Sequence, residues 1–556
     1  MEKRKIIIEK LFPNLKTFPE NIEKKYPSRN LKQETLVTRI APSPTGFLHI
    51  GGIYAGLLSE RLAHQSNGIF YIRIEDTDKK REIKGATELA IKSFETFGIF
   101  ADEGETLSGE EKGNYGPYKQ SKREEIYKTF AKKLVKEGYA YPCFCTSEEL
   151  EKINIKQKEN EIRTGYYEKW AQCREKSDEE ILQALNKNKP FVIRFKSNGN
   201  NNNRIEFNDL IKGKLSLPEN DQDIVIIKSD GLPTYHFAHV IDDHFMRTTN
   251  VLRGDEWLSS ISLHLELFKT LNWNPPKYGH FPPINILEGN SKRKLSKRKD
   301  PEANVFYYDK EGYPTNAIIE YLLNLIDSSF EEWRKQNPKI DNTKFHINLK
   351  HLSASAGPLL DMQKLQDISK NYISQLSTKE IFQQCNEWAK KYDKDLAKRL
   401  ENDSEYIKKI FSIERDGDKP RKDTAKWSDI KCQIEYFFDD IFKNIKIDLN
   451  ELLPNIQKIE IEKIAKQFLL IYNEKDNKDE WFLKLKKMAK SLGYADNIKS
   501  YKEQTDQYKG HIGDVAMILR VLLTKRKQTP DLFQMIQCMG TARLNSRLKK
   551  FNILFI

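Results

Sequence analysis

The hydrophobic and polar positions first form a regular pattern between Leu36 and Glu75. The segment LVTRIA at the start of this stretch predicts a β-strand, and it ends in PSPTG, which can continue neither a strand nor a helix. From Gly52 the spacing predicts a helix (GIYAGLLSERLAHQ), with apolar residues near one face at Ile53, Leu57, Leu58 and Leu62. IFYIRIE, from Ile69, predicts a second strand. A strand, a crossover helix and a strand form a βαβ unit, which predicts a parallel sheet.

The rest of the chain divides into a mixed middle and a helical end. Beyond Glu110 the pattern becomes helical and charged, and Asn198–Asn203 (NGNNNN) predicts a surface loop, so this region reads as an insertion that interrupts the sheet. We expect the sheet to resume with Asp223–Ser229 (DIVIIKS), followed by a turn and then by TYHFAHVIDDH. After roughly residue 310, amphipathic helices dominate.

Composition narrows the class of protein. The chain has 556 residues, which predicts several domains, and no segment approaches the ~18 uninterrupted apolar residues of a membrane helix. The N-terminal apolar run spans three residues, and five acidic residues precede Leu36, so we expect no targeting segment and a cytoplasmic protein. The net charge of +13 favours a polyanionic partner, although a lysine-rich solvated surface explains it equally well.

Six cysteines are too few for a disulfide framework in a chain of this length. Cys143 and Cys145 lie close enough in sequence to supply two thiolates to a zinc ion, and Cys173 is a candidate third ligand. No fourth ligand of the His or Cys type lies nearby in the sequence. We therefore expect no metal ligands, with zinc as the alternative that we do not favour.

The turn after the first strand carries the first chemical signal. His49, Gly51 and Gly52 lie at a strand-to-helix junction, where glycines let the backbone approach a phosphate and the helix N-terminus stabilises its charge. Neither a Walker A sequence nor G-x-G-x-x-G is present here, which disfavours the P-loop and dinucleotide-binding folds. Taken alone, the motif is also compatible with an ordinary tight turn.

A second signal lies far downstream, in Lys292–Lys299 (KRKLSKRK), where six of eight residues are basic. Such a run is usually a solvated loop or a contact for a polyanion. Nucleotidyl transfer needs mobile cations for the charge that develops on leaving phosphates, and a loop of this kind can supply them.

Together the two segments resemble the HIGH and KMSKS signatures of class I aminoacyl-tRNA synthetases. They read His49-Ile-Gly-Gly52 and Lys294-Leu-Ser-Lys-Arg298. TRIAPSPTG, LHIGG and IRIEDTD are similar to the glutamyl-tRNA synthetase family in particular, as are GPYKQSKR, KSDGLPTYHFAHVIDDH and VLRGDEW. LRVLLT and TPDLF resemble the end of that family's anticodon-binding domain. Several ordered, spaced motifs are a far more specific signal than one.

The chain departs from the family pattern at three places. Gly52 replaces the last histidine of HIGH, which leaves the first histidine and the glycine in place. The CFC segment, where many bacterial members bind zinc, lacks a full ligand set in the sequence. The lead-in before Leu36 is absent from the shorter members.

The resemblance implies an α/β fold with a Rossmann-type catalytic domain, an α+β insertion and an all-α C-terminal region. The implied boundaries are an N-terminal extension at 1–35, a catalytic domain at 36–310 with an insertion for the tRNA acceptor end at about 111–222, a helical stem-contact region at 311–377 and a helical anticodon-binding domain at 378–556.

It further implies that glutamate and ATP form glutamyl adenylate, with Mg²⁺ on the phosphates, and that the glutamyl group then passes to the 3′ end of tRNA(Glu). His49 and Lys297 are the implied catalytic residues, and ATP would be bound by His49, Gly51, Gly52, Trp257, Lys294 and Lys297. Glutamate would be bound by Arg39, Ser43, Glu75, Tyr235 and Arg253. Arginine suits this task because its planar fork matches a carboxylate.

Single residues also have plainer interpretations. Arg39 could instead pair with Asp76, and Tyr235 could be a core residue with a satisfied hydroxyl. Asp242 and Asp243 are candidates for a structural or metal-related role, and His239 for a satisfied core histidine.

Several alternatives for the whole protein remain open. The alternative within the class is an enzyme that also glutamylates tRNA(Gln), because anticodon discrimination depends on a few residues of the helical half. A short tRNA-modifying relative would lack that half, an inactive tRNA-binding protein would not need His49 and Lys297, and another nucleotidyltransferase would not need a long basic C-terminal domain. We expect a monomer by resemblance.

Overall fold

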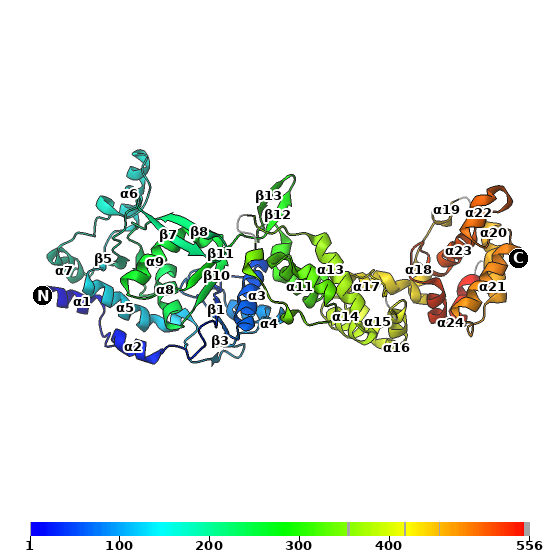
Figure 1. Cartoon of the computed structure of the whole chain (residues 1–556), viewed down its shortest axis with the longest axis horizontal. Helices are drawn as coiled ribbons and strands as arrows, with labels where there is room; N and C mark the ends of the chain where they lie inside the picture. Colours follow the sequence, from blue (N-terminus) through cyan, green and yellow to red (C-terminus); the bar gives the residue numbers. More distant parts are fainter. Residues whose placement is uncertain (1, 353–355, 416, 418, 455, 550–556) are drawn as a thin grey trace. The chain divides into compact units, whose positions relative to one another are not determined.

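A computed structural model describes residues 2–352, 356–415, 417, 419–454 and 456–549 (Figure 1). The chain forms two compact units. One consists of Met1–Tyr307 with Ile319–Asp361, and the other of Tyr308–Ile318 with Met362–Ile556. Among the described residues, no helix combines the length and the apolar character that a membrane span needs.

The first unit is built on a parallel sheet. Its strands are β1 (Val37–Ile40), β2 (Ile69–Ile72) and β3 (Glu103–Glu105), and β10 (Asn250–Gly254) and β11 (Lys277–Phe281) form a second parallel pair. β1 pairs with β2 in parallel, β2 with β3, and β10 with β11, while the short β4 (Glu111–Lys112) runs antiparallel to β3. The Thr249 N–H donates to the Val37 carbonyl at 3.0 Å, which places β10 beside β1.

The predicted βαβ unit is confirmed, with α3 (Ile50–Gln65) as the crossover helix. The helix begins two residues before the predicted Gly52 because His49 caps it with its side chain. Ile53, Leu57 and Leu58 are completely buried, so the helix packs its apolar stripe against the sheet.

The prediction that the parallel sheet resumes at Asp223–Ser229 is wrong. This segment forms β9 (Val225–Ile227), which pairs antiparallel with β6 (Val192–Phe195). β6 in turn pairs with β5 (Ala140–Cys143), and TYHFAHVIDDH forms helix α8 (Tyr235–Phe245). A short apolar run indicates a buried strand but does not indicate which strand it will pair with.

Further elements of the first unit surround these two sheets. The insertion carries the antiparallel hairpin β7–β8 (Arg204–Asp209 and Gly213–Pro218), and the basic signature begins on a second hairpin, β12–β13 (Asn285–Glu288 and Ser291–Lys294). The helices are α4 (Ala86–Thr96), α5 (Glu124–Glu137), α6 (Ser147–Glu159), α7 (Asp178–Asn186), α9 (Ile261–Thr270) and α12 (Phe330–Gln336).

Beyond β13 the described residues contain helices and no strand, as the sequence pattern predicts. The helices α10 (Val305–Glu311) and α11 (Thr315–Ile326) each have residues in both units. The other α-helices of the second unit are α13 (Met362–Gln375), α14 (Thr378–Tyr392), α15 (Lys394–Asn402), α16 (Ser404–Ser412), α17 (Trp427–Ile434), α18 (Asp439–Asn444), α19 (Leu449–Leu452), α20 (Lys458–Ile471), α21 (Lys478–Ser491), α22 (Ile498–Glu503), α23 (Ile512–Thr524) and α24 (Leu532–Lys549). All of these except α22 contribute residues to one hydrophobic core.

The lead-in before residue 36 is part of the core of the first unit. It forms α1 (Glu2–Leu11) and α2 (Pro19–Lys25), which contact α5, and α1 also contacts α7. Its buried residues belong to the same hydrophobic cluster as α5 and α8, and they are Ile7, Leu11, Phe12, Ile22 and Tyr26.

A bidentate ion pair fastens this lead-in to the sheet. Both terminal nitrogens of Arg29 donate to the Glu103 carboxylate at 2.7 Å, and the guanidinium lies 3.8 Å from the centre of the Tyr115 ring. The Arg29 side chain is only 6% exposed and that of Glu103 12%. Removing one partner from such a pair leaves a buried charge uncompensated.

We therefore expect Arg29→Met to lower the free energy of unfolding by about 3 kcal/mol. Thermal and urea unfolding followed by circular dichroism measure the change. Lys3→Met is the matched control, because Lys3 pairs with Glu179 where both side chains are more than half exposed, and such pairs contribute little. Equal stability of the two variants would contradict a bracing role for Arg29.

Candidate functional site

A cleft of about 1150 Å³ opens at the carboxyl ends of β1, β2 and β10, the position at which open α/β sheets bind ligands. All eleven residues that the sequence assigns to ATP or glutamate line it. The cleft carries four carboxylates, from Glu75, Asp78, Asp230 and Glu256. It carries twice as many lysines and arginines, namely Arg39, Lys79, Lys80, Arg81, Lys228, Arg253, Lys294 and Lys297. This excess of positive charge suits an anionic ligand.

The N-terminus of α3 forms one wall of the cleft. His49 is the N-cap, and its Nδ1 accepts a hydrogen bond from the Gly51 N–H at 2.9 Å, which leaves the ring proton on Nε2. Burial and the neighbouring cations Lys297 and Lys294 lower the pKa of His49, so the ring is neutral at neutral pH. A neutral donor beside a helix N-terminus is a suitable phosphate contact.

The basic signature reaches the same wall. The Lys297 ammonium donates to the carbonyl of Phe47, and the backbone of Leu295 hydrogen-bonds to the His49 ring. Leu295 is only 2% exposed and anchors the loop in the protein. The structure thus brings together two segments that lie about 250 residues apart in the sequence.

The arrangement of this loop depends on an ion pair within it. Arg293 donates twice to Asp300 at 2.7 Å, and the Asp300 carboxylate also accepts the Ser296 N–H at 2.8 Å. These contacts hold the pKa of Asp300 at about 2, so the carboxylate stays ionised wherever the protein is folded at ordinary pH. Lys297 is therefore presented from a braced turn.

The opposite wall holds the two arginines that the sequence assigns to glutamate. Arg39 lies on β1 and Arg253 on β10, and both are buried. Tyr235, at the start of α8, places its hydroxyl 3.3 Å from Arg253, and its ring lies 4.3 Å from that of Trp257. A pocket with two buried guanidinium groups and an aromatic wall is suited to a small ligand that carries a carboxylate.

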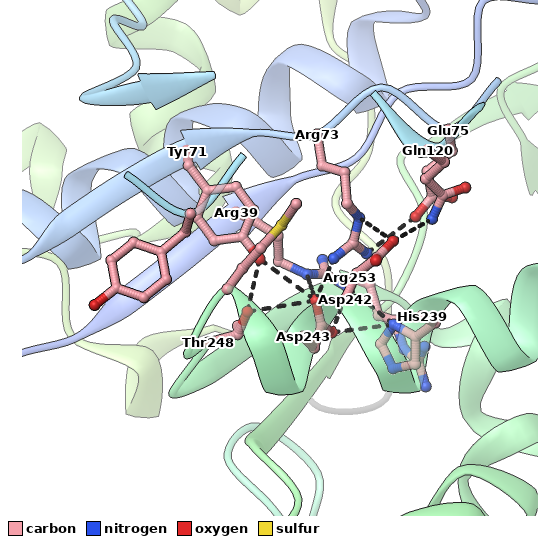
Figure 2. A network of polar contacts seen from close by, with 12 residues as sticks. Arg39, Tyr71, Arg73, Glu75, Gln120, His239, Asp242, Asp243, Thr248 and Arg253 are labelled. Carbon is pink, nitrogen blue, oxygen red and sulfur yellow. Dashed lines mark hydrogen bonds and ion pairs between the residues drawn. The ribbon is translucent and has the colours of Figure 1, made fainter. Parts of the chain in front are cut away.

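Two adjacent aspartates of α8 organise the arginines around this pocket. Asp243 accepts from Arg73 at 2.6 Å and, more weakly, from Arg39 at 3.4 and 3.5 Å (Figure 2). Asp242 accepts from Arg123 at 2.6 Å. The two aspartates and Arg73 and Arg123 are essentially inaccessible to solvent, which makes this a buried cluster of opposite charges.

The same cluster decides between the interpretations of Arg39 and His239. Arg39 pairs with Asp243 and not with Asp76, whose carboxylate instead accepts the Ser121 N–H at 2.8 Å. His239 is completely buried, with Nδ1 3.1 Å from Asp243 and Nε2 3.0 Å from the Tyr278 hydroxyl, so it is a satisfied core histidine. Asp242 and Asp243 hold cations of the protein itself, which is the structural role that the sequence offered for them.

Burial and neighbouring charges act in opposite directions on the pKa of Glu75, which also lines the cleft. Burial raises the pKa of Glu75, and Arg73 and Arg39 offset only part of that rise. Arg73 donates to Glu75 at 3.1 Å, a contact that favours the ionised form. A nearby ligand ammonium would stabilise the carboxylate further.

Sequence reasoning missed several residues of the cleft. Lys79, Lys80 and Arg81 directly follow IRIEDTD and line the cleft, as do Lys228 and Gln120. Lys79, Lys80 and Arg81 could have been found from the sequence, because they are three consecutive basic residues that follow the end of a predicted strand. Gln120 gave no such signal, because its partner Asp242 lies 122 residues away.

A separate cluster of thiols lies in the insertion. The sulfur atoms of Cys143, Cys145 and Cys173 all lie within 4.8 Å of one another, with 3.6 Å between those of Cys145 and Cys173. The Tyr166 hydroxyl is 3.4 Å from the first of these sulfurs and 3.2 Å from the second. Hydrogen bonds from the two neighbouring thiols lower the pKa of the Cys143 thiol. Sulfur atoms about 3.8 Å apart are what tetrahedral zinc coordination requires, so this donor set fits a zinc ion.

Comparison with known proteins agrees with this geometry. Residues 35–366 match the family described as tRNA synthetases class I (E and Q), catalytic domain, and residues 380–552 match the family described as anticodon binding domain. The fold and the cleft therefore define a class I aminoacyl-tRNA synthetase.

Full-length relatives narrow the family further. A glutamate–tRNA ligase from Clostridium perfringens strain SM101 is 48% identical, with 97% of this chain and 98% of the relative covered. One from Sorangium cellulosum is 41% identical, with 96% and 97% covered. The crystal structure of a glutamate tRNA ligase from Elizabethkingia meningosepticum in complex with its amino acid has a TM-score of 0.74 at 26% identity, covering 94% of this chain and 100% of that one. The chain belongs to the glutamate–tRNA ligase family.

Proposed function

We propose that this protein joins glutamate to tRNA(Glu) in two ATP-dependent steps at the cleft of the first unit. The observation that supports this most directly is that one cleft holds a capped helix N-terminus and Lys297 on one wall and two buried arginines on the other. A nucleoside triphosphate and a small dicarboxylic acid need complementary charges of this kind.

In the first step, the α-carboxylate of glutamate attacks the α-phosphorus of ATP and pyrophosphate leaves. His49 and the backbone of Gly51 and Gly52 would hold the phosphates, with Lys294 nearby and Trp257 against the adenine. Lys297 would stabilise the negative charge that grows on the leaving pyrophosphate. No covalent enzyme intermediate is needed, so positioning and charge supply the acceleration.

Glutamate itself would be recognised by Arg39 and Arg253, with Ser43 and Tyr235 as hydrogen-bonding companions and Glu75 opposite the α-ammonium group. Glutamine would place a neutral amide where these guanidinium groups need an anion. A buried cation without its counter-charge is costly, and this difference would exclude glutamine.

In the second step, a terminal ribose hydroxyl of tRNA attacks the acyl carbon of the adenylate, and AMP leaves. We propose that residues 111–222 receive the tRNA acceptor end, 311–377 contact the stem and 378–556 bind the anticodon. The net charge of +13 supports the binding of a polyanion of this size. Residues 1–35 are proposed as an N-terminal extension that braces the catalytic domain of 36–310, and the enzyme as a cytoplasmic monomer.

Magnesium would enter with ATP, bound to its phosphate oxygens, where it neutralises their charge. Each of the four carboxylates of the cleft already has a protein cation: Arg73 for Glu75, Arg81 for Asp78, Lys228 for Asp230 and Lys294 for Glu256. In the described structure these four carboxylates are therefore already engaged by cations of the protein.

We expect the purified protein to charge tRNA(Glu) with labelled glutamate and to leave labelled glutamine unused, because the two arginines require a carboxylate. Aminoacylation with purified glutamate and glutamine tRNAs, each offered both amino acids, measures this. Charging of tRNA(Gln) by glutamate as well would establish the alternative, a non-discriminating enzyme. Charging of neither tRNA would refute the proposed function.

Lys297→Ala should slow adenylate formation by about 10²- to 10³-fold, because it removes a cation from the developing pyrophosphate charge. Rapid-quench measurement of adenylate and a filter-binding assay with tRNA separate the two activities, and we expect tRNA affinity to change little. Lys292→Ala, on the neighbouring hairpin and outside the cleft, is the matched control. Equal losses in both assays would count against this role for Lys297.

The thiol cluster favours the alternative that the sequence left second, and we propose that Cys143, Cys145 and Cys173 hold a structural zinc ion with the Tyr166 hydroxyl at the fourth position. Elemental analysis of protein purified without chelators should find about one zinc per chain. Cys145→Ser should abolish it, whereas Cys432→Ser, which alters an exposed cysteine outside the cluster, should leave it unchanged. Zinc-free wild-type protein after growth with added zinc would exclude the site.

A further inference from the structure

The surroundings of Arg253 differ from those of every other arginine in the charged cluster. Arg253 is only 6% exposed, yet within the described residues no carboxylate lies at ion-pair distance from it. Its terminal nitrogens make long contacts with neutral groups, 3.3 Å to the Tyr235 hydroxyl, 3.3 Å to His264 Nδ1 and 3.5 Å to the Trp257 carbonyl. Its one contact of ordinary hydrogen-bond length is from Nε to His280 Nε2, at 3.0 Å.

This contact fixes the proton arrangement of His280. The Arg253 Nε–H can only donate, so His280 Nε2 must accept and the ring proton must lie on Nδ1. Nδ1 lies 2.6 Å from Asp209 Oδ2, which accepts a hydrogen bond from the Nδ1–H group. Burial keeps the imidazole neutral by lowering the pKa of His280, although Asp209 opposes the shift.

Asp209 is held just as firmly. Its Oδ1 accepts the backbone N–H groups of Ile211, Lys212 and His280 at 2.9, 2.9 and 3.1 Å. Burial alone would raise the pKa of Asp209, but the hydrogen bonds from His280 and from these backbone groups lower it on balance. The carboxylate is therefore ionised and fixed, which gives His280 a single favoured ring orientation and tautomer.

The three residues come from two separate parts of the first unit. Arg253 and His280 are paired neighbours on the parallel strands β10 and β11, so their side chains share a face of the sheet. Asp209 is the last residue of β7, in the insertion. The Leu210 N–H donates to the Tyr278 carbonyl at 2.8 Å and docks this end of the hairpin on β11.

We infer that Asp209 and His280 are positioning residues that orient Arg253 for the carboxylate of glutamate. This inference rests on the proposed role of Arg253 in binding glutamate. A carboxylate placed directly against Arg253 would occupy its fork and compete with the substrate. An imidazole between the two holds Nε and leaves both terminal nitrogens to the ligand, while the balancing negative charge stays one ring away.

Asp209→Asn tests this arrangement through the tautomer. The amide oxygen can keep the three backbone hydrogen bonds, but the amide nitrogen must then donate to His280 Nδ1. The ring proton is forced onto Nε2, where it faces the Arg253 Nε–H, donor against donor. We expect the KM for glutamate, measured by aminoacylation at saturating ATP and tRNA, to rise about tenfold or more, and the KM for ATP to stay within about twofold.

Substitutions of His280 separate positioning from packing. In His280→Gln, the longer side chain can still offer an acceptor to Arg253 but gives up the hydrogen bond to Asp209. In His280→Asn, the shorter side chain can donate to Asp209 but cannot reach Arg253. His280→Asn should therefore raise the KM for glutamate more than His280→Gln does. A purely structural role predicts the reverse order, because His280→Gln leaves the buried Asp209 carboxylate without its side-chain donor.

A double-mutant cycle completes the test. In the His280→Gln background, Asp209→Asn should add little to the KM for glutamate, because the ring that carries the tautomer is absent. Glu206→Gln is the matched control, since Glu206 is an exposed residue of the same strand and should behave as wild type. Thermal unfolding of each variant reports its stability separately.

The outcomes distinguish the two ideas. If Arg253→Lys leaves the KM for glutamate unchanged, the proposed role of Arg253 fails. If Arg253→Lys raises it but Asp209→Asn does not, or if the two effects of Asp209→Asn and His280→Gln simply add, the positioning inference is wrong and glutamate binding by Arg253 stands.

Discussion

Two consecutive buried carboxylates, Asp242 and Asp243 of α8, are the interaction on which the first unit depends. Ions are expensive to remove from water, and they remain ionised in the interior only when each has a partner in good geometry. Here the partners are Arg39 on β1, Arg73 directly after β2, and Arg123 directly before α5. The strand ends around the cleft are therefore coupled to α8, and a shift in any of them would leave a buried charge without its partner or expose it to solvent.

The pairing is uneven, and the unevenness has a functional consequence. Asp243 binds Arg73 at 2.6 Å but Arg39 only at 3.4 and 3.5 Å, and Arg253 has no carboxylate at contact distance among the described residues. Arg73 is thus neutralised by a carboxylate of the protein, while Arg39 and Arg253, which line the cleft, can still pair with an anionic ligand. A site of this kind is organised before the ligand arrives, so less binding energy is spent on ordering it.

What the sequence predicted well was local. The strand–helix–strand unit from Val37 to Ile72 depends on residues near one another in the chain, and the structure shows it where periodicity and turn chemistry placed it. The helix start was predicted two residues too late, because the capping role of the His49 side chain was not anticipated. The pairing of distant segments was not predictable in this way. β9 joined the antiparallel sheet of the insertion, and Arg39 found Asp243, 204 residues away, in preference to the nearby Asp76. The approach of Tyr166 to two cysteines had no signal, because a tyrosine is not among the usual zinc ligands.

The departure at the end of the HIGH segment has a physical explanation in the first turn of α3. A Cβ atom at Gly52 would lie 2.9 Å from Cδ1 of Leu48, so any larger residue requires Leu48 to move. With glycine at this position, Leu48 packs beside the helix start, and the helix cap is supplied by His49 alone. The groups available to a phosphate are then the His49 ring, the backbone of the first turn and Lys297. The Lys297 ammonium lies beside this turn, where it donates to the Phe47 carbonyl. Loss of the second histidine therefore removes one side-chain donor but leaves the backbone N–H groups of the helix N-terminus open to a phosphate. The positive charge of that terminus comes from the backbone, so it does not depend on any side chain of the motif.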